Sequence, residues 1–236
     1  MTVRERTEAL FEKQVAELTA SREFRALESG TAAPADYDRF LADVVRTHLK
    51  ATEYVAFLCA LAPPATSESR LRNLLEEVHH PGLLRQLAVG AGLGDRLPDL
   101  EAQAADDLRR LVVEPVLYRT LGEVGLAAFC EVVAFEFMLA RQAGRIGAFL
   151  ASHRGLGPVA LRWWTEHADV DVQHAAEGLE DLETYARYYD LADEDGLAIA
   201  ELTLRENVFL RRYFRDRPLG EAPAMPGVVE STPCAS

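Results

Sequence analysis

Apolar residues recur along nearly the whole chain at intervals of three and four, and this periodicity constrains the fold more than any other feature. Such spacing places apolar side chains on one stripe of an α-helix. A β-strand would instead show sustained alternation of polar and apolar residues, which the sequence lacks. The sequence therefore predicts an all-α protein, a bundle of about seven helices.

Prolines, glycines and capping residues divide this periodic pattern into separate helices. The segment that begins near Thr66 is expected to continue through Pro81 as one helix. The expected helices cover residues 3–19, 24–30, 34–61, 66–90, 99–112, 115–152, 158–189 and 195–215. Residues 1–217 are enough for one domain with its own core. Residues 218–236 are rich in proline and small side chains, which predicts a disordered tail.

Charge and cysteine content narrow the classes to which the chain can belong. A formal net charge of −13 argues against a nucleic-acid partner, because phosphate binding requires a basic surface. No stretch is long and apolar enough to predict a membrane span or a signal peptide. Cys59, Cys130 and Cys234 show no pairing pattern and are expected to be reduced thiols in a cytoplasmic protein. The sequence leaves open whether the protein is a homodimer.

The strongest chemical signal is His167-x-x-x-Asp171-x-x-His174 in one expected helix. At about 100° per residue, these three side chains lie within about 60° of one another around the helix axis. Trp163 lies one turn earlier on the same face, which indicates that this face points into the protein. Two imidazoles and a carboxylate suit a first-row metal such as iron or manganese. The alternative is a pair of surface histidines on an acidic helix.

A second signal, Glu77-x-x-His80, has the spacing that places a carboxylate and an imidazole on one helix face. Glu-x-x-His is the pair that carboxylate-bridged di-metal bundles donate from a single helix. The adjacent pair, Glu76 and His79, has the same spacing, and apolar neighbours do not decide between the two registers. Taken alone, the motif is more often a set of surface residues, with His80 in a turn before Pro81.

A third signal is Glu136, which lies in the apolar stretch AAFCEVVAFEFMLA. A carboxylate buried without a partner either stays protonated or is strongly unfavourable, so an ionised Glu136 needs a cation as its partner. That cation would be a metal ion, or one of the side chains Arg141 and Arg145. Glu131 shares the stretch but lies about 140° away around the helix, so it is not assigned to the site.

Together, three helices offer six candidate metal ligands. They are Glu77, His80, Glu136, His167, Asp171 and His174. Three carboxylates and three imidazoles are enough to hold two metal ions and to leave coordination positions open for O2. The sequence lacks the usual motifs of competing chemistry, namely phosphate-binding and dinucleotide-binding glycine loops, the serine-hydrolase elbow and zinc-type spacing of cysteines and histidines.

These residues resemble a known family, the haem-oxygenase-like diiron oxidases. The segment from Asn73 to HPGLLRQLAVGAGL is similar to the family's first ligand helix, and EFMLARQ through HADVDVQHA is similar to its second ligand block. The likeness spans nearly the whole chain except both ends. It places the family's glutamate on Glu77, four residues after Asn73. Its histidine falls on His80, because Leu83 and Leu84 follow at three and four residues.

The resemblance implies a haem-oxygenase-like bundle that holds two iron ions in place of haem, with all six ligand positions filled. It implies an oxidase or oxygenase that uses O2, with an external electron donor allowed by the chemistry. The implied substrate is a small molecule with an amine or a carboxylate, and the reaction is N-oxygenation or oxidative C–C cleavage. Candidates for lining a substrate pocket are His48, Tyr54, Phe57, Arg141 and Arg145.

The fold alone leaves other functions open. One alternative is a metal-free enzyme, either a thiamin-hydrolysing type with Cys130 as nucleophile or a cofactor-free quinone-forming oxidase. Another is a non-enzymatic helical binding protein in which the histidines are incidental. Neither alternative accounts for six ligand-type side chains at these spacings, so the diiron oxidase is the favoured prediction.

Overall fold

The computed structural model describes residues 2–113 and 118–214, and within these ranges all regular structure is helical. This confirms the predicted all-α class. The helices are α1 (Val3–Ala20), α2 (Arg22–Ser29), α3 (Pro34–His48), α4 (Ala51–Leu61), α5 (Ser67–Glu77), α6 (His80–Gly90), α7 (Leu97–Val113), α8 (Leu121–Arg154), α9 (Pro158–Tyr188), α10 (Asp193–Glu206) and α11 (Val208–Phe214). Two short 3-10 helices, η1 (Pro64–Thr66) and η2 (Gly94–Arg96), lie between them.

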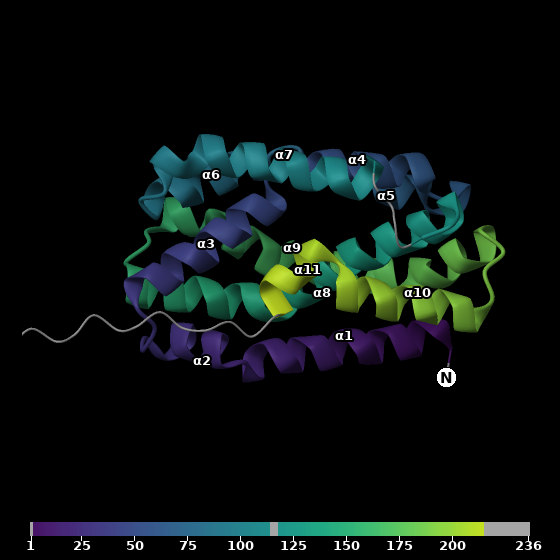
Figure 1. The fold of residues 1–236 in the computed structure, drawn as a ribbon, viewed down its shortest axis with the longest axis horizontal. Helices are drawn as coiled ribbons and strands as arrows, with labels where there is room; N and C mark the ends of the chain where they lie inside the picture. Colours follow the sequence, from purple (N-terminus) through teal and green to yellow (C-terminus); the bar gives the residue numbers. More distant parts are fainter. Residues whose placement is uncertain (1, 114–117, 215–236) are drawn as a thin grey trace, which may run out of the picture.

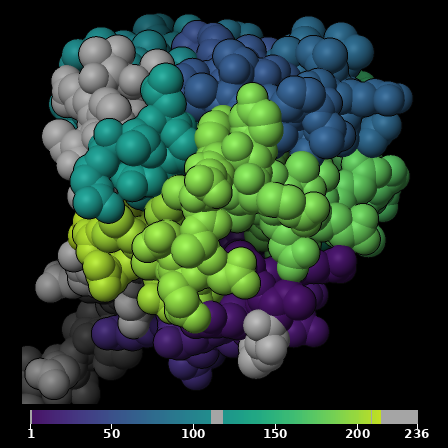
Figure 2. Space-filling view, turned by 90° about the vertical axis from the view of Figure 1, so that its right-hand side faces the viewer, coloured from purple at the N-terminus to yellow at the C-terminus, as the bar shows by residue number. Residues whose placement is uncertain are grey.

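The long helices α8 and α9 form the centre of the bundle and share its most extensive interface (Figure 1). Helices α4 to α7 form a layer on one side of this pair, with α3 packed against α6 and α7. Helices α1 and α10 pack on the other side. Figure 2 views one end of the bundle and shows α10 between α1 and the α4–α5 pair.

The expected helix over residues 66–90 is divided in two, and the physical cause is Pro81. Proline has no N–H to donate, and its ring collides with the carbonyl group four residues earlier, here that of Glu77. Helix α5 therefore ends at Glu77 and α6 begins at His80. The freed carbonyl oxygen of Glu77 accepts a hydrogen bond from the hydroxyl of Thr52 at 2.8 Å. The prediction that one helix continues through Pro81 was wrong, and the break places the Glu-x-x-His motif at a helix junction.

Two other expected helices also divide. Residues 34–61 form α3 and α4, which are separated at Leu49 and Lys50. The last helix divides at Asn207, whose side-chain Oδ1 accepts hydrogen bonds from the N–H groups of Phe209 and Leu210 and so caps α11. The bundle therefore contains more and shorter helices than the periodicity alone predicts.

The helix expected over residues 115–152 is observed as α8 (Leu121–Arg154), and its two ends are set by capping residues that the periodicity did not indicate. Thr120 caps α8 by accepting a hydrogen bond from the N–H of Glu123, so α8 begins at Leu121. The proposed start at Pro115 lies outside the described residues, as do Cys234 and the tail over residues 218–236. Gly155 ends α8 with a φ of 64°, a left-handed conformation that glycine adopts without steric cost.

One continuous hydrophobic core extends from α1 to α11, with Trp163 and Trp164 among its largest buried side chains. Both of the cysteines described, Cys59 and Cys130, are free thiols. None of the described helices combines the length and apolar character needed to cross a bilayer.

Candidate metal centre

Helix α9 carries the His-Asp-His line on its buried face. His167, Asp171 and His174 are 3%, 1% and 7% exposed. The Nδ1–H of His167 donates to the carbonyl oxygen of Trp163 at 2.7 Å, which leaves Nε2 of the ring as the free lone pair. Holding one ring nitrogen by a backbone carbonyl is the usual way in which a protein orients a histidine ligand.

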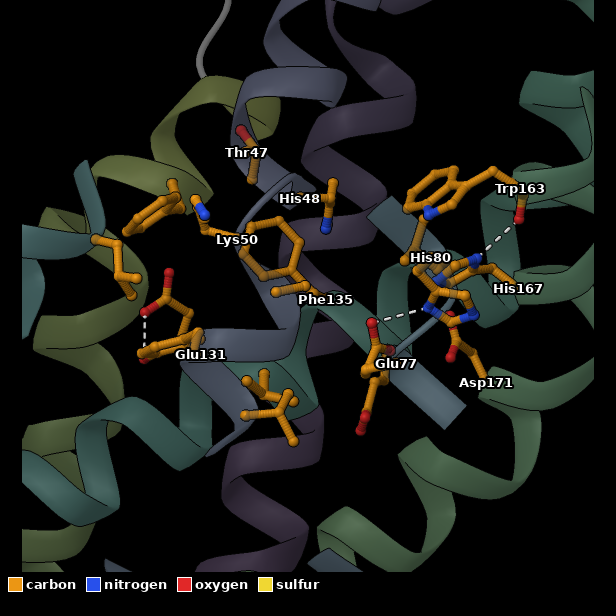
Figure 3. A pocket seen from close by; sticks show the side chains of 18 residues that line it. Thr47, His48, Lys50, Glu77, His80, Glu131, Phe135, Trp163, His167 and Asp171 are labelled. Carbon is orange, nitrogen blue, oxygen red and sulfur yellow. Dashed lines mark hydrogen bonds and ion pairs between the residues drawn. The ribbon is translucent and has the colours of Figure 1, made fainter. Parts of the chain in front are cut away.

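The junction of α5 and α6 brings the Glu77–His80 pair against this line. His80 is buried, and its Nδ1 is 2.8 Å from Oε2 of Glu77. The ring centroids of His80 and His167 are 4.4 Å apart. Glu77, His80 and His167 each offer one ligand atom, and these three atoms lie within 4.8 Å of one another (Figure 3). The structure thus joins half of the predicted ligand set into one group.

The other three candidate ligands are Glu136 on α8 and Asp171 and His174 on α9. They form a second group, further along α9 than His167. Nδ1 of His174 is 3.4 Å from Oδ1 of Asp171 and 3.9 Å from Oε1 of Glu136. The amide of Asn73 donates to the same Oε1 of Glu136 at 2.6 Å. Glu136 therefore faces the cluster rather than the arginines considered as its partners, because Arg141 and Arg145 pair with Glu12 and Glu28 at the surface.

Three buried atoms in this second group have no hydrogen-bond partner among the described residues. They are Oε2 of Glu136, Oδ2 of Asp171 and Nδ1 of His174. Buried polar atoms are nearly always paired, and each exception requires an explanation. All three are lone-pair donors of the kind that first-row metals accept, so the residues fit a metal ion at this position.

The electrostatics indicate the same requirement for positive charge. Burial raises the pKa of Asp171 and of Glu136, because an ionised carboxylate is poorly solvated there. For His174, burial opposes the charged form, but the carboxylates of Asp171, Glu136 and Glu76 outweigh it and raise the pKa. For His167, burial and the neighbouring His80 lower the pKa well below the usual value. The raised pKa values of Asp171, Glu136 and His174 therefore mark a group of side chains whose carboxylates are stabilised by positive charge.

The structure separates the two neighbouring histidines. The side chain of His80 is 4% exposed and faces His167, whereas that of His79 is 53% exposed. Nε2 of His79 lies 2.9 Å from Oε2 of Glu166, and these two residues form a second candidate group with His80 at the surface. The inward position therefore belongs to the Glu77–His80 register.

Glu76 is the residue that the sequence reasoning missed. Its Oε2 accepts a hydrogen bond from Nε2 of His174 at 2.6 Å, which leaves Nδ1 directed toward Asp171. Glu76 and Glu77 follow Asn73 by three and four residues, so both lie on the same side of α5 as Asn73. That spacing from Asn73 is the signal in the sequence that could have indicated this role, whereas Glu76 is interpreted from the sequence only as part of the competing Glu76–His79 pair.

A cavity of about 70 Å³ lies beside the cluster. Five of the six candidate ligands line it, and His174 does not. His48 and Tyr54 also line the cavity, in contrast to the other pocket candidates, Phe57, Arg141 and Arg145. His48 bonds through Nε2 to the Tyr213 hydroxyl at 2.9 Å, and burial lowers its pKa to about 3, so the ring is neutral.

Cys130 has the properties of a core residue. It is 1% exposed, and burial raises its pKa to about 12. It is not among the residues that line the cavity. A thiol that remains protonated and lies away from the pocket is a poor nucleophile, so a thiol-dependent hydrolase is not favoured.

An all-helical bundle with carboxylates and imidazoles buried between its helices is the architecture of proteins that hold non-haem iron. A family model described as "Iron-containing redox enzyme" matches residues 38–205, which include all six candidate ligands. The chain belongs to this family, and its fold is the haem-oxygenase-like bundle that the resemblance implied. The protein is accordingly an oxidoreductase of an iron-containing class. No curated protein matches the sequence.

Proposed function

We propose that the protein is a non-haem diiron enzyme that uses O2 to oxidise a small molecule bearing an amine or a carboxylate. The observation that carries this proposal is the convergence of six ligand-type side chains in two adjoining groups. Glu77, His80 and His167 form one group. Glu136, Asp171 and His174 form the other group. Each of these three has one buried atom with a lone pair that has no hydrogen-bond partner among the described residues.

Several residues hold these side chains in place before any metal binds. The carbonyl of Trp163 orients His167, the carboxylate of Glu76 orients His174, and the amide of Asn73 orients Glu136. Asp171 lies between the two histidines on α9 and faces the cavity, which suits a ligand shared by both groups. Such prior orientation lowers the cost of assembling the site.

When bound, a pair of ferrous ions would supply the redox chemistry with O2. The chain provides a largely apolar chamber beside it, formed by Val132, Phe135, Leu139 and Trp163. These walls exclude water, which protects reactive species and strengthens electrostatic contacts inside the cavity. A small organic substrate would occupy this space next to the five cavity-facing ligands.

Anaerobic loading with ferrous iron, followed by metal analysis and Mössbauer spectroscopy, tests the proposal. Two irons per chain and iron-dependent O2 consumption are expected. His167→Ala should lose both, because it removes a ligand together with its anchored orientation. His153→Ala is the matched control, since His153 is exposed and lies outside the cavity. Binding of one iron or none by the wild type, or full iron binding and activity in His167→Ala, would refute the diiron assignment.

A further inference from the structure

The cavity has a second polar end, away from the candidate ligands. Glu131 lies there, 1% exposed, with Phe135 between it and the ligand group in Figure 3. Two donors reach its carboxylate, the Tyr54 hydroxyl at 2.8 Å and the Asn207 amide at 2.7 Å, and both bind Oε2. Among the described residues, no donor binds Oε1.

This carboxylate also has no ion-pair partner among the described residues. Lys50 lines the same cavity, but its ammonium group pairs with Glu53. Arg212 attracts Glu131 only at longer range and pairs directly with Asp107. Burial raises the pKa of Glu131 to about 7, although both donors oppose that change. A buried carboxylate on a cavity wall, with one oxygen left without a donor, is a site for a cation from solution.

We propose that Glu131 is a specificity-determining residue that binds the ammonium group of an amine substrate. The proposal rests on the function proposed above, because it assumes that the cavity is the substrate site. Glu131 precedes Glu136 by five residues on α8, a rise of roughly 7.5 Å along the helix axis. The ammonium group and the oxidised position of the substrate are therefore several bonds apart.

The wall between these two ends suits a hydrocarbon chain. Val132, Phe135 and Leu139 line the cavity from the same helix as Glu131 and Glu136. An aliphatic chain would bury apolar surface against them, while a charged terminus would bind Glu131. The substrate class is thus an aliphatic amine whose ammonium group lies remote from the site of oxidation.

A structural role for Glu131 has to be separated from this one. Its bond to Asn207 supports the residue that caps α11, so removal of the side chain would disturb that junction. Glu131→Gln avoids this problem, because the amide oxygen still accepts from Tyr54 and Asn207. The substitution removes the charge and leaves the packing volume almost unchanged.

The test compares n-hexylamine with 1-hexanol, which have equal chain length but differ in charge. Calorimetric titrations at about pH 8 would use the full chain, both iron-loaded under nitrogen and metal-depleted. Wild type should prefer the amine by roughly tenfold or more, the usual size of a charge-assisted hydrogen bond. Glu131→Gln should abolish most of this preference with little effect on hexanol. Glu201→Gln, an exposed glutamate on α10, should keep it.

Equal binding of the two probes by wild type, absence of binding by either, or an unchanged preference in Glu131→Gln would overturn the proposal. If Glu131→Gln does not fold, Glu131→Asp replaces it. That variant keeps the charge but shortens the side chain by one methylene. Hexylamine should then bind several-fold more weakly, while the affinity for hexanol stays the same. Equal losses of affinity for both probes would count against the proposal. The metal-depleted arm distinguishes the two proposals, because amine preference can persist there even if iron binding fails.

Discussion

The imidazole Nε2–H of His174 donates to Oε2 of Glu76 at 2.6 Å, and this bond joins α9 to α5. It turns Nδ1 of His174 toward Asp171 and Glu136, where this nitrogen has no hydrogen-bond partner among the described residues. A carboxylate that holds the far side of a ligand histidine raises its basicity and fixes its orientation. Glu76 thereby becomes part of the candidate metal centre without facing the metal position.

Glu76→Ala should therefore weaken iron binding by about 10–100-fold, the usual effect of losing such a partner. The measurement is iron retention against a competing chelator, with helical content followed by circular dichroism. Glu68→Ala provides the control, because Glu68 is an exposed residue on the same helix. Unchanged retention in Glu76→Ala would mean that the bond to His174 is incidental.

His80→Ala should lose at least one iron per chain, whereas His79→Ala should bind iron as wild type does. The difference follows from their positions, since His80 faces His167 and His79 bonds to Glu166 at the surface. Metal analysis after anaerobic loading measures both variants side by side. The reverse pattern, with iron lost only in His79→Ala, would assign the ligand to the neighbouring register.

The stability of the protein should depend on the protonation of Glu131. Its pKa is about 7 in the fold, compared with 4.5 for a free glutamate, so the folded state holds this proton more tightly. The free energy of unfolding should therefore fall as the pH rises from about 4.5 to about 7, by on the order of 3 kcal/mol from this group. The ionisable or charged groups around it are Tyr54, Tyr118, Cys130 and Arg212, with Lys50 on the same cavity.

Urea unfolding of wild type and Glu131→Gln at several pH values isolates this contribution. The other groups that titrate are common to both proteins and cancel in the difference. The variant should gain stability relative to wild type as the pH rises through that interval and show a constant advantage above it. A difference that does not change with pH would show that the carboxylate ionises in the fold as freely as in water.

Cys130→Ala should keep both the iron content and the O2 consumption of wild type. The thiol is buried, protonated and away from the cavity, so its loss should only reduce packing, at a cost on the order of 1 kcal/mol. Thermal unfolding measures that cost, and an oxygen electrode measures the activity. Loss of O2 consumption with full iron content would contradict this prediction and would assign the thiol a part in the oxidation.

Much of the fold could be predicted because helix formation responds to local patterns. The start of α8 after Thr120 and the stop at Gly155 follow from capping chemistry. The break at Pro81 could also have been predicted, because the clash with the carbonyl of Glu77 is a local effect. The break at Asn207 is different, since that residue is held by Glu131 on another helix.

The sequence by itself determined which side chains share a helix face, because the rotation per residue is constant along a helix. That was enough to align His167, Asp171 and His174 on α9. The pairing of Glu77 with His80 was expected from the family resemblance, because the spacing fits Glu76 with His79 equally well. Only the tertiary structure decided which helices face one another, and so which residues far apart in the chain meet. Glu76 and His174 are 98 positions apart, and no local spacing encodes their hydrogen bond. It depends on how α5 packs against α9, which is set by the burial of apolar surface throughout the bundle.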